Sequence, residues 1–157
     1  MKTLSLLLFL LLVFSNSCKK DELHLSVTDY MIFGHFYGEC KGEACIEIFR
    51  LEQNQLLEDT KDQYPNSTDF YEGKYYQLPA QKYEDVKDIL TFFPKDLLNE
   101  PNRVIGQPDA GDWGGLYIEY NVNGLRKFWL IDQMKNNVPA KYHAFIVKVN
   151  EKIAMLQ

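Results

Sequence analysis

The chain has 157 residues and a net charge of −5 at neutral pH. This length allows one domain with a hydrophobic core of useful size, and the acidic balance argues against nucleic acid as a partner, because phosphates are bound by basic surfaces. Aromatic residues make up 14% of the chain, which favours strands and a well-filled core, or a surface on which a ligand stacks.

The first 17 residues have the pattern of a secretory signal peptide. Lys2 opens the chain, residues 4–14 are apolar apart from Ser5, and small polar residues follow. A positive start, an apolar stretch of about 7–15 residues and a small-residue cleavage site are typical of such signals. A membrane span needs about 20 apolar residues, so this stretch is too short to remain as one. Removing residues 1–17 leaves 16 basic and 22 acidic residues, a net charge of −6.

Ser15-Asn16-Ser17-Cys18 follows the apolar stretch. This segment resembles the lipobox of bacterial lipoproteins, in which the cysteine is lipidated on sulfur and the signal is cut just before it. Ser17 fits the small-residue position, whereas Ser15 stands where the family usually has leucine. The resemblance covers residues 1–18 only, and it implies a lipidated Cys18, a tether over residues 18–26 and membrane association through acyl chains. The alternative is plain secretion, with Cys18 as an incidental thiol.

The charged residues after Cys18 indicate in which membrane of the cell envelope the lipoprotein is expected. Lys19 occupies the position where aspartate would resemble an inner-membrane retention signal. The cluster Lys19-Lys20-Asp21-Glu22 resembles the export signal of certain Gram-negative surface lipoproteins, and its alternative reading is a solvated linker. We therefore expect a lipid anchor in the bacterial outer membrane, with the domain facing the periplasm or the cell surface.

Residues 25–61 predict strands. Residues 25–37 are rich in β-branched and aromatic side chains, and residues 45–52 alternate between apolar and polar, which indicates two strands with a turn between them. Residues 56–61 predict a short edge strand. Residues 62–78 read mainly as a loop, because they contain Pro65, Asn66 and Gly73, with an extended stretch expected at residues 75–78.

Cys40 and Cys45 lie in the first of these turns. Zinc knuckles use two-residue spacing and a second ligand pair, which the chain lacks, and redox sites of the thioredoxin type need C-x-x-C at the start of a helix. The signal peptide places the chain in an oxidising compartment. We therefore predict a Cys40–Cys45 disulfide that fixes the loop, rather than a metal or redox site. If the two cysteines face each other directly, His35 stands opposite Arg50.

Two later segments have helical periodicity. After Pro79, apolar residues recur at helical spacing up to Pro94, which predicts a helix over residues 80–93. A second helix is expected to begin near Pro139, with an apolar stripe that packs on a sheet face. The stripe consists of Tyr142, Phe145, Ile146, Val149, Ile153 and Leu156.

Between the helices, residues 101–115 read as a glycine-rich loop and residues 116–131 as a hairpin. Asn123-Gly124 is the preferred type I′ turn. It sets a register in which Val122 faces Leu125 and Leu116 faces Ile131. One face of the hairpin is then core. The other face, which carries Tyr117, Glu119, Asn121, Arg126, Phe128 and Leu130, is mixed, so we expect it to be half covered.

These elements predict a single α+β domain over residues 27–157: an antiparallel sheet built from β-hairpins, with two helices packed on one face. Residues 78–83 and 138–142 begin the two helices alike, which leaves open a duplicated hairpin–helix unit.

Two function classes are compatible with this domain. The first is a non-enzymatic binding module for a protein, peptide or glycan, including an inhibitor or immunity protein. The candidate ligand contacts are Trp113, Tyr117, Tyr71 and Tyr76, and their alternative role is edge-of-core packing. The second is a small, hydrolase-like envelope enzyme that uses Asp109, Asp112 or His35. The sequence contains no nucleophile motif or phosphate-binding loop, so we assign no catalytic residue, metal site or cofactor.

Overall fold

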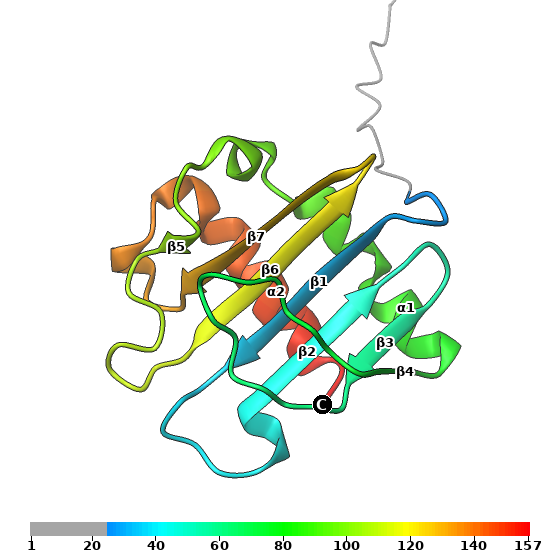
Figure 1. The fold of residues 1–157 in the computed structure, drawn as a ribbon, viewed down its shortest axis with the longest axis horizontal. Coiled ribbons are helices and arrows are strands. Elements are labelled where there is room, and N and C mark those ends of the chain that lie inside the picture. Colours follow the sequence, from blue (N-terminus) through cyan, green and yellow to red (C-terminus); the bar gives the residue numbers. More distant parts are fainter. Residues whose placement is uncertain (1–24) are drawn as a thin grey trace, which may run out of the picture.

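The computed structural model describes residues 25–157. The predicted signal peptide, Cys18 and the tether as far as residue 24 lie outside the described residues. Leu25 belongs to the core, so the packed domain includes at least two residues before the predicted boundary at residue 27. Residues 25–157 form a seven-stranded sheet with helices on one face (Figure 1), which confirms the predicted α+β class.

The strands follow the order β4-β3-β2-β1-β6-β7-β5 across the sheet. Neighbouring strands are antiparallel, except that β5 runs parallel to β7. Their bounds are β1 Tyr30–Phe36, β2 Ile46–Leu51, β3 Leu56–Asp59, β4 Tyr75–Gln77, β5 Val104–Ile105, β6 Gly115–Val122 and β7 Leu125–Asp132. Two expectations were wrong: β3 is not the edge, because β4 lies outside it, and the predicted loop over residues 101–115 contains β5.

The β6–β7 hairpin has the predicted register, with Val122 opposite Leu125 and Leu116 opposite Ile131. Asn123 and Gly124 have φ angles of 54° and 77°, as a type I′ turn requires. Leu125 was expected in the core but is 43% exposed at the hairpin tip, whereas Val122 opposite it is buried in the core.

The helices α1 (Ala80–Val86) and α2 (His143–Ala154) lie behind the sheet in Figure 1. A 3₁₀ helix over Lys87–Phe92 continues α1, so the predicted helix over residues 80–93 changes type after its first two turns. The apolar stripe of α2 is buried against the sheet from Tyr142 to Ile153, with Leu156 partly buried. Within residues 25–157, neither helix has the length and apolar character that crossing a membrane requires.

The opposite face of the sheet is covered by residues 60–74, which we call the strap. The strap links β3 to β4 and crosses in front of the sheet in Figure 1. Beneath it, Tyr117 and Phe128 are buried together with Ile32 and Ile48. The mixed hairpin face is therefore more deeply covered than the sequence predicts.

The two halves of the chain share the start of a helix but not an arrangement of strands. Pro79 and Pro139 have nearly the same backbone conformation, with φ −55° and ψ 145° in the first and φ −53° and ψ 134° in the second. However, α1 follows the four strands β1–β4, whereas α2 follows the β6–β7 hairpin. A repeated hairpin–helix unit does not describe this topology.

Candidate binding pocket beside strand β7

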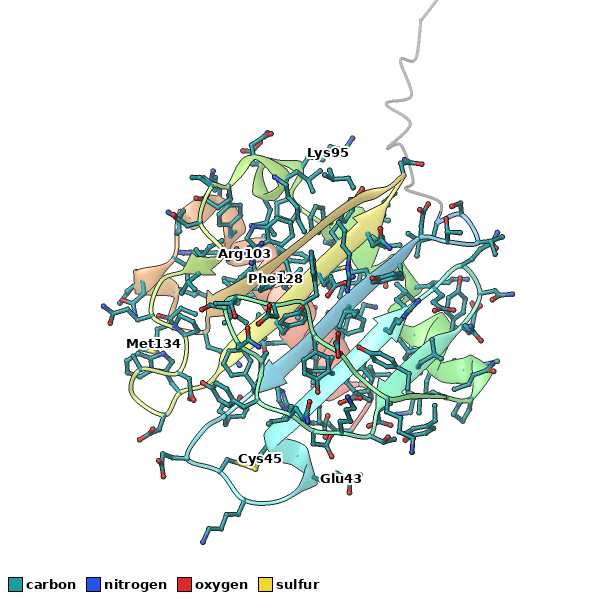
Figure 2. The ribbon with its side chains drawn as sticks, in the orientation of Figure 1. Glu43, Cys45, Lys95, Arg103, Phe128 and Met134 are labelled. Carbon is teal, nitrogen blue, oxygen red and sulfur yellow. A yellow bond between two sulfur atoms is a disulfide. The ribbon has the colours of Figure 1, made fainter. Side chains whose placement is uncertain are left out.

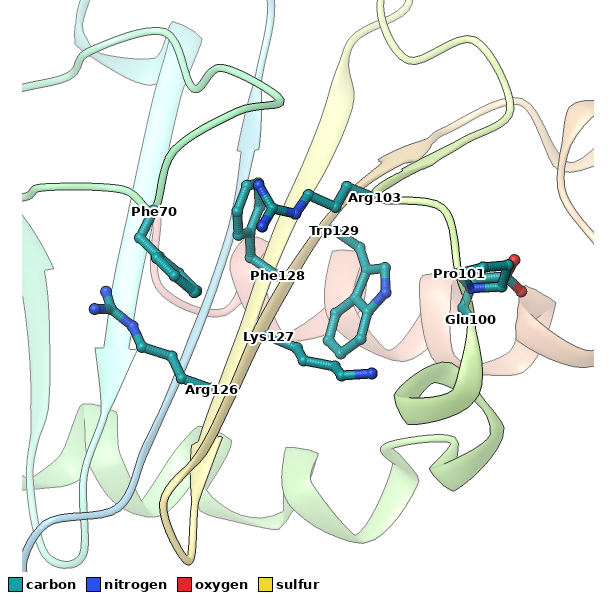
Figure 3. Close-up of a pocket in the computed structure, with 8 residues that line it drawn as sticks. All are labelled: Phe70, Glu100, Pro101, Arg103, Arg126, Lys127, Phe128 and Trp129. Atoms are coloured by element: carbon teal, nitrogen blue, oxygen red, sulfur yellow. The ribbon is translucent and has the colours of Figure 1, made fainter.

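A pocket of about 240 Å³ lies beside β7. The strap contributes Phe70, the segment before β5 contributes Glu100, Pro101 and Arg103, and β7 contributes residues 126–129. Because successive side chains of a strand point to opposite faces, β7 supplies Arg126 and Phe128 on one side and Lys127 and Trp129 on the other. Figure 3 shows the two sets on either side of the strand.

Two aromatic rings hold the guanidinium groups of the pocket. The Arg126 guanidinium lies 3.9 Å from the centre of the Phe70 ring, and that of Arg103 lies 4.7 Å from the centre of the Phe128 ring. Phe70 and Phe128 contact each other edge to face, with 5.1 Å between their centres. Arginine stacked in this way keeps a fixed orientation while its N–H groups remain available.

The cations of the pocket are only partly neutralised. Arg126 Nε donates to the buried Glu119 carboxylate at 2.8 Å. Burial acts to lower the pKa of Arg126, but the hydrogen bond and charge of Glu119 outweigh it, so the pKa is raised. Within residues 25–157, Arg103 and Lys127 form no ion pair. Arg103 Nη1 donates to the Thr68 carbonyl at 2.5 Å, and Lys127 Nζ donates to the Leu98 carbonyl at 2.6 Å.

Glu100 is the acidic residue of the pocket lining, and it accepts a hydrogen bond from the Tyr142 hydroxyl at 3.1 Å. Three cations and one carboxylate therefore line a partly apolar cavity, and Glu119 pairs with one of the cations, so the site keeps a positive balance in a protein whose overall charge is negative. This local reversal of charge suits a ligand with an anionic group.

The four aromatic residues proposed from the sequence as ligand contacts do not form one exposed platform. Tyr117 is fully buried, Tyr71 is 8% exposed, and their ring centres are 5.6 Å apart under the strap. Tyr76 is exposed at β4, where its hydroxyl donates to Glu58. Trp113 is half-buried, and its Nε1 donates to Asp132 at 2.8 Å. Tyr71 and Tyr117 are therefore core residues, and their hydroxyls donate to the carboxylates of Asp59 and Glu119.

The residues proposed for catalysis are also not brought together. Asp109 accepts hydrogen bonds from the amides of Gly38 and Gly114 and from the Tyr64 hydroxyl, so its carboxylate joins loops. Asp112 is exposed, with a φ of 60°. His35 is buried, with Nε2 3.0 Å from the Ala44 carbonyl. In residues 25–157 no hydrogen bond or ion pair links His35 to either aspartate.

The predicted Cys40–Cys45 disulfide forms, with 5.6 Å between the two Cα atoms. It lies beyond the lower end of β2 in Figure 2, away from Arg103 and Phe128. The register expected from it was wrong, because His35 pairs with Glu47. Cys45 ends a 3₁₀ turn beside Tyr37, whereas Cys40 lies farther into the loop, so the cysteines do not face each other across the ladder. The described residues contain no cluster of three or more His, Cys, Asp or Glu that could hold a metal ion.

Sequence reasoning missed the pocket residues. Arg126 and Phe128 were placed on the mixed hairpin face, but nothing near them in sequence indicated Phe70 or Arg103. The available signal was Arg126-Lys127 directly before a buried apolar run, since two cations at the start of a buried strand place charge at the edge of the core. No protein-family model matches the chain, and a search of the curated proteins finds no similar sequence.

Proposed function

We propose that this protein is a lipid-anchored binding module of the bacterial cell envelope, which holds an anionic group of a protein, peptide or glycan ligand in the pocket beside β7. The observation that carries the proposal is the gathering of Arg103, Arg126 and Lys127 around one cavity of an acidic protein. The stacking of both arginines on Phe70 and Phe128 favours recognition by a preformed site over a diffuse surface attraction.

The pocket can be tested by charge reversal. The full-length chain, solubilised in a neutral detergent, is immobilised and exposed to an envelope extract of its own source, and the retained material is compared between wild type and Arg103→Glu. Lys41→Glu is the matched control, because it makes the same change of charge in the exposed disulfide loop. We expect Arg103→Glu to lose ligands that wild type and Lys41→Glu retain. Loss with Lys41→Glu alone would assign the contact to the disulfide loop and refute the pocket.

The anchor is tested separately. Cells that express the full-length chain are labelled with a palmitate analogue, and we expect label on wild type and none on Cys18→Ala. Label that persists on Cys18→Ala would overturn the lipoprotein part of the proposal and leave the pocket unaffected.

A further inference from the structure

The outer edge of β7 is only partly covered. β7 has β6 on one side and β5 on the other, but β5 pairs only with Leu130 and Ile131. The chain before β5 contains Pro101, which has no N–H for a ladder, and it leaves the strand there. Among residues 25–157, no strand neighbours residues 126–128 on this side of β7, and the pocket occupies that place.

The register shows which backbone groups face the pocket. The Leu130 amide donates outward to the Arg103 carbonyl at 2.8 Å. Since backbone groups alternate in direction along an antiparallel strand, those of Phe128 and Arg126 also point outward, while Lys127 and Trp129 bond to β6. In residues 25–157 no acceptor pairs with the amide of Phe128 or Arg126. An edge of this kind is a template for an added strand.

The side chains beside this edge favour an acidic strand. An added segment would place alternate side chains toward Arg103 and Arg126 on one side of β7 and toward Lys127 on the other. Arg126 uses Nε for Glu119, and Arg103 uses Nη1 for Thr68. Each guanidinium therefore retains N–H donors, and their forked geometry matches a carboxylate. Small-molecule sites usually have volumes of about 300–1,000 Å³, and this pocket is smaller. Its size suits individual side chains of a peptide better than an enclosed cofactor.

We propose that the ligand is an extended segment of a partner protein that adds to β7 as a strand beside residues 126–128 and places a carboxylate on Arg103 and Arg126. The proposal rests on the binding function proposed above and specifies its ligand. Backbone pairing supplies recognition of an extended peptide, and the arginines select an acidic side chain or a free C-terminus.

Fluorescently labelled hexapeptides test the proposal by anisotropy with the full-length chain in dodecyl maltoside micelles. The first peptide alternates glutamate and valine and is amidated at its C-terminus. In the second, glutamine replaces glutamate. The third is the second peptide with a free C-terminal carboxylate. The fourth is the first peptide with its central amides N-methylated, which removes backbone donors and keeps the charge.

We expect the N-methylated peptide to bind at least tenfold more weakly than the first peptide. The amidated glutamine–valine peptide should bind at least tenfold more weakly than the better of the two carboxylate peptides. Arg103→Ala should weaken that peptide by a similar factor, and Lys41→Ala should leave it unchanged. Tighter binding of the first or the third peptide tells whether the carboxylate comes from an acidic side chain or from a C-terminus. Amide exchange at Arg126, which is exposed at this edge, should slow when the best peptide binds.

Two other outcomes refute the proposal in different ways. In the first, N-methylation has no effect, and dextran sulfate competes with the peptides for wild type but not for Arg103→Ala. The pocket then binds anions without strand addition, so the inference fails and the proposed binding function stands. If neither the peptides nor dextran sulfate distinguish wild type from Arg103→Ala, the proposed function of the pocket fails as well.

Discussion

The two faces of the sheet are closed by different kinds of interaction. On the helix side, Phe33, Trp129 and Ile146 belong to one large apolar cluster that also includes α1 and α2. On the strap side, a smaller cluster around Tyr117 and Phe128 lies beside buried carboxylates. Helices satisfy their own backbone groups and need only an apolar stripe, whereas an irregular segment must find partners for its N–H groups elsewhere.

Two acidic residues accept hydrogen bonds on the strap side, Asp59 from the strap itself and Glu119 from side chains of the sheet beneath it. Glu119 accepts hydrogen bonds from the hydroxyls of Tyr30 and Tyr117, at 2.9 Å and 2.6 Å, as well as from Arg126. Asp59 accepts from the Tyr71 hydroxyl and from the amides of Lys61, Asp62 and Lys74. The Tyr71 amide in turn donates to the Tyr117 hydroxyl at 2.9 Å. Hydrogen bonds thus hold the strap in place, whereas the helices are held by close packing of buried apolar side chains.

This contrast teaches that mutations should act differently on the two faces. The helix side should respond to lost volume, and the strap side to lost acceptors and to the charge state of its tyrosines. The measurement in each case below is the free energy of unfolding of the full-length chain by urea.

The largest effect is expected for Phe33→Ala on the helix side. Phe33 is fully buried and packs on Phe49, with 5.8 Å between ring centres. Truncation of a buried phenylalanine removes its transfer energy and leaves a cavity, at a cost of about 3–5 kcal/mol. Leu125→Ala is the control, because Leu125 is 43% exposed at the hairpin tip, and it should cost less than about 1 kcal/mol. Equal losses would mean that the helix side does not depend on packing.

On the strap side, Glu119→Gln should cost about 2–3 kcal/mol. The amide keeps the shape of the side chain, but one acceptor oxygen becomes an NH₂ group that cannot accept, and the remaining hydrogen bonds lose the charge. Glu58→Gln is the matched control, since Glu58 also accepts from a tyrosine hydroxyl but that tyrosine, Tyr76, is exposed. We expect the control to change stability by less than about 1 kcal/mol. A Glu119→Gln loss no larger than that of Glu58→Gln would show that the strap does not depend on this acceptor.

Stability should also fall above pH 10. Burial and the nearby carboxylates Asp59 and Glu119 raise the pKa values of Tyr71 and Tyr117 above the usual value near 10. A pKa that is raised in the folded state contributes stability that is complete below pH 10 and is lost as pH rises, because the unfolded chain then releases protons that the fold retains.

Each such tyrosine contributes a loss on the order of 1 kcal/mol per pH unit above 10. Unfolding is compared at pH 9 and pH 11 in wild type and in the double variant Tyr71→Phe with Tyr117→Phe. The double variant should lose less stability between the two values, since lysines and the other tyrosines titrate in both proteins. An identical loss in both proteins would show that Tyr71 and Tyr117 do not cause the loss of stability at high pH.

The same contrast explains what the sequence could predict. The stripe from Tyr142 to Leu156 and the Asn123-Gly124 turn are local signals, so the second helix and the hairpin register were predictable. The Cys40–Cys45 disulfide was also local, but its register was wrong by three residues because a 3₁₀ turn precedes β2. The strap has no periodicity, and its path depends on Asp59 and on the distant Tyr117.

The pocket could not be predicted for a related reason. Phe70, Arg103 and Arg126 come from three separate segments and meet only when the strap and β5 take their places on the sheet. β5 has two residues, which is too short for an alternating pattern to be recognised. The charge of the pocket is also hidden in the overall composition, because the chain as a whole is acidic.

The smallest effects are expected for two single hydroxyls. The Tyr71 hydroxyl donates to Asp59 at 2.6 Å and accepts from the Gln63 amide at 3.2 Å, whereas the Tyr75 hydroxyl is buried and has no hydrogen-bond partner in the described part of the chain. Tyr71→Phe removes the hydroxyl donor to Asp59, whose Oδ2 still accepts from the Lys61 and Asp62 amides, and the acceptor of the Gln63 amide. The loss of these two hydrogen bonds should cost about 1 kcal/mol. Tyr75→Phe removes a polar atom that gains nothing from burial, so stability should stay within about 0.5 kcal/mol of wild type or rise.

Both changes delete one oxygen and leave the aromatic ring in place, so the difference between them isolates the hydrogen bonds from ring packing. Parallel urea titrations at pH 7 compare the two variants without a contribution from tyrosine ionisation, because both hydroxyls are protonated there in the folded and unfolded states. Equal losses would mean that ring packing holds the strap and that Asp59 contributes little. In that case the two faces of the sheet would differ in composition but not in what stabilises them.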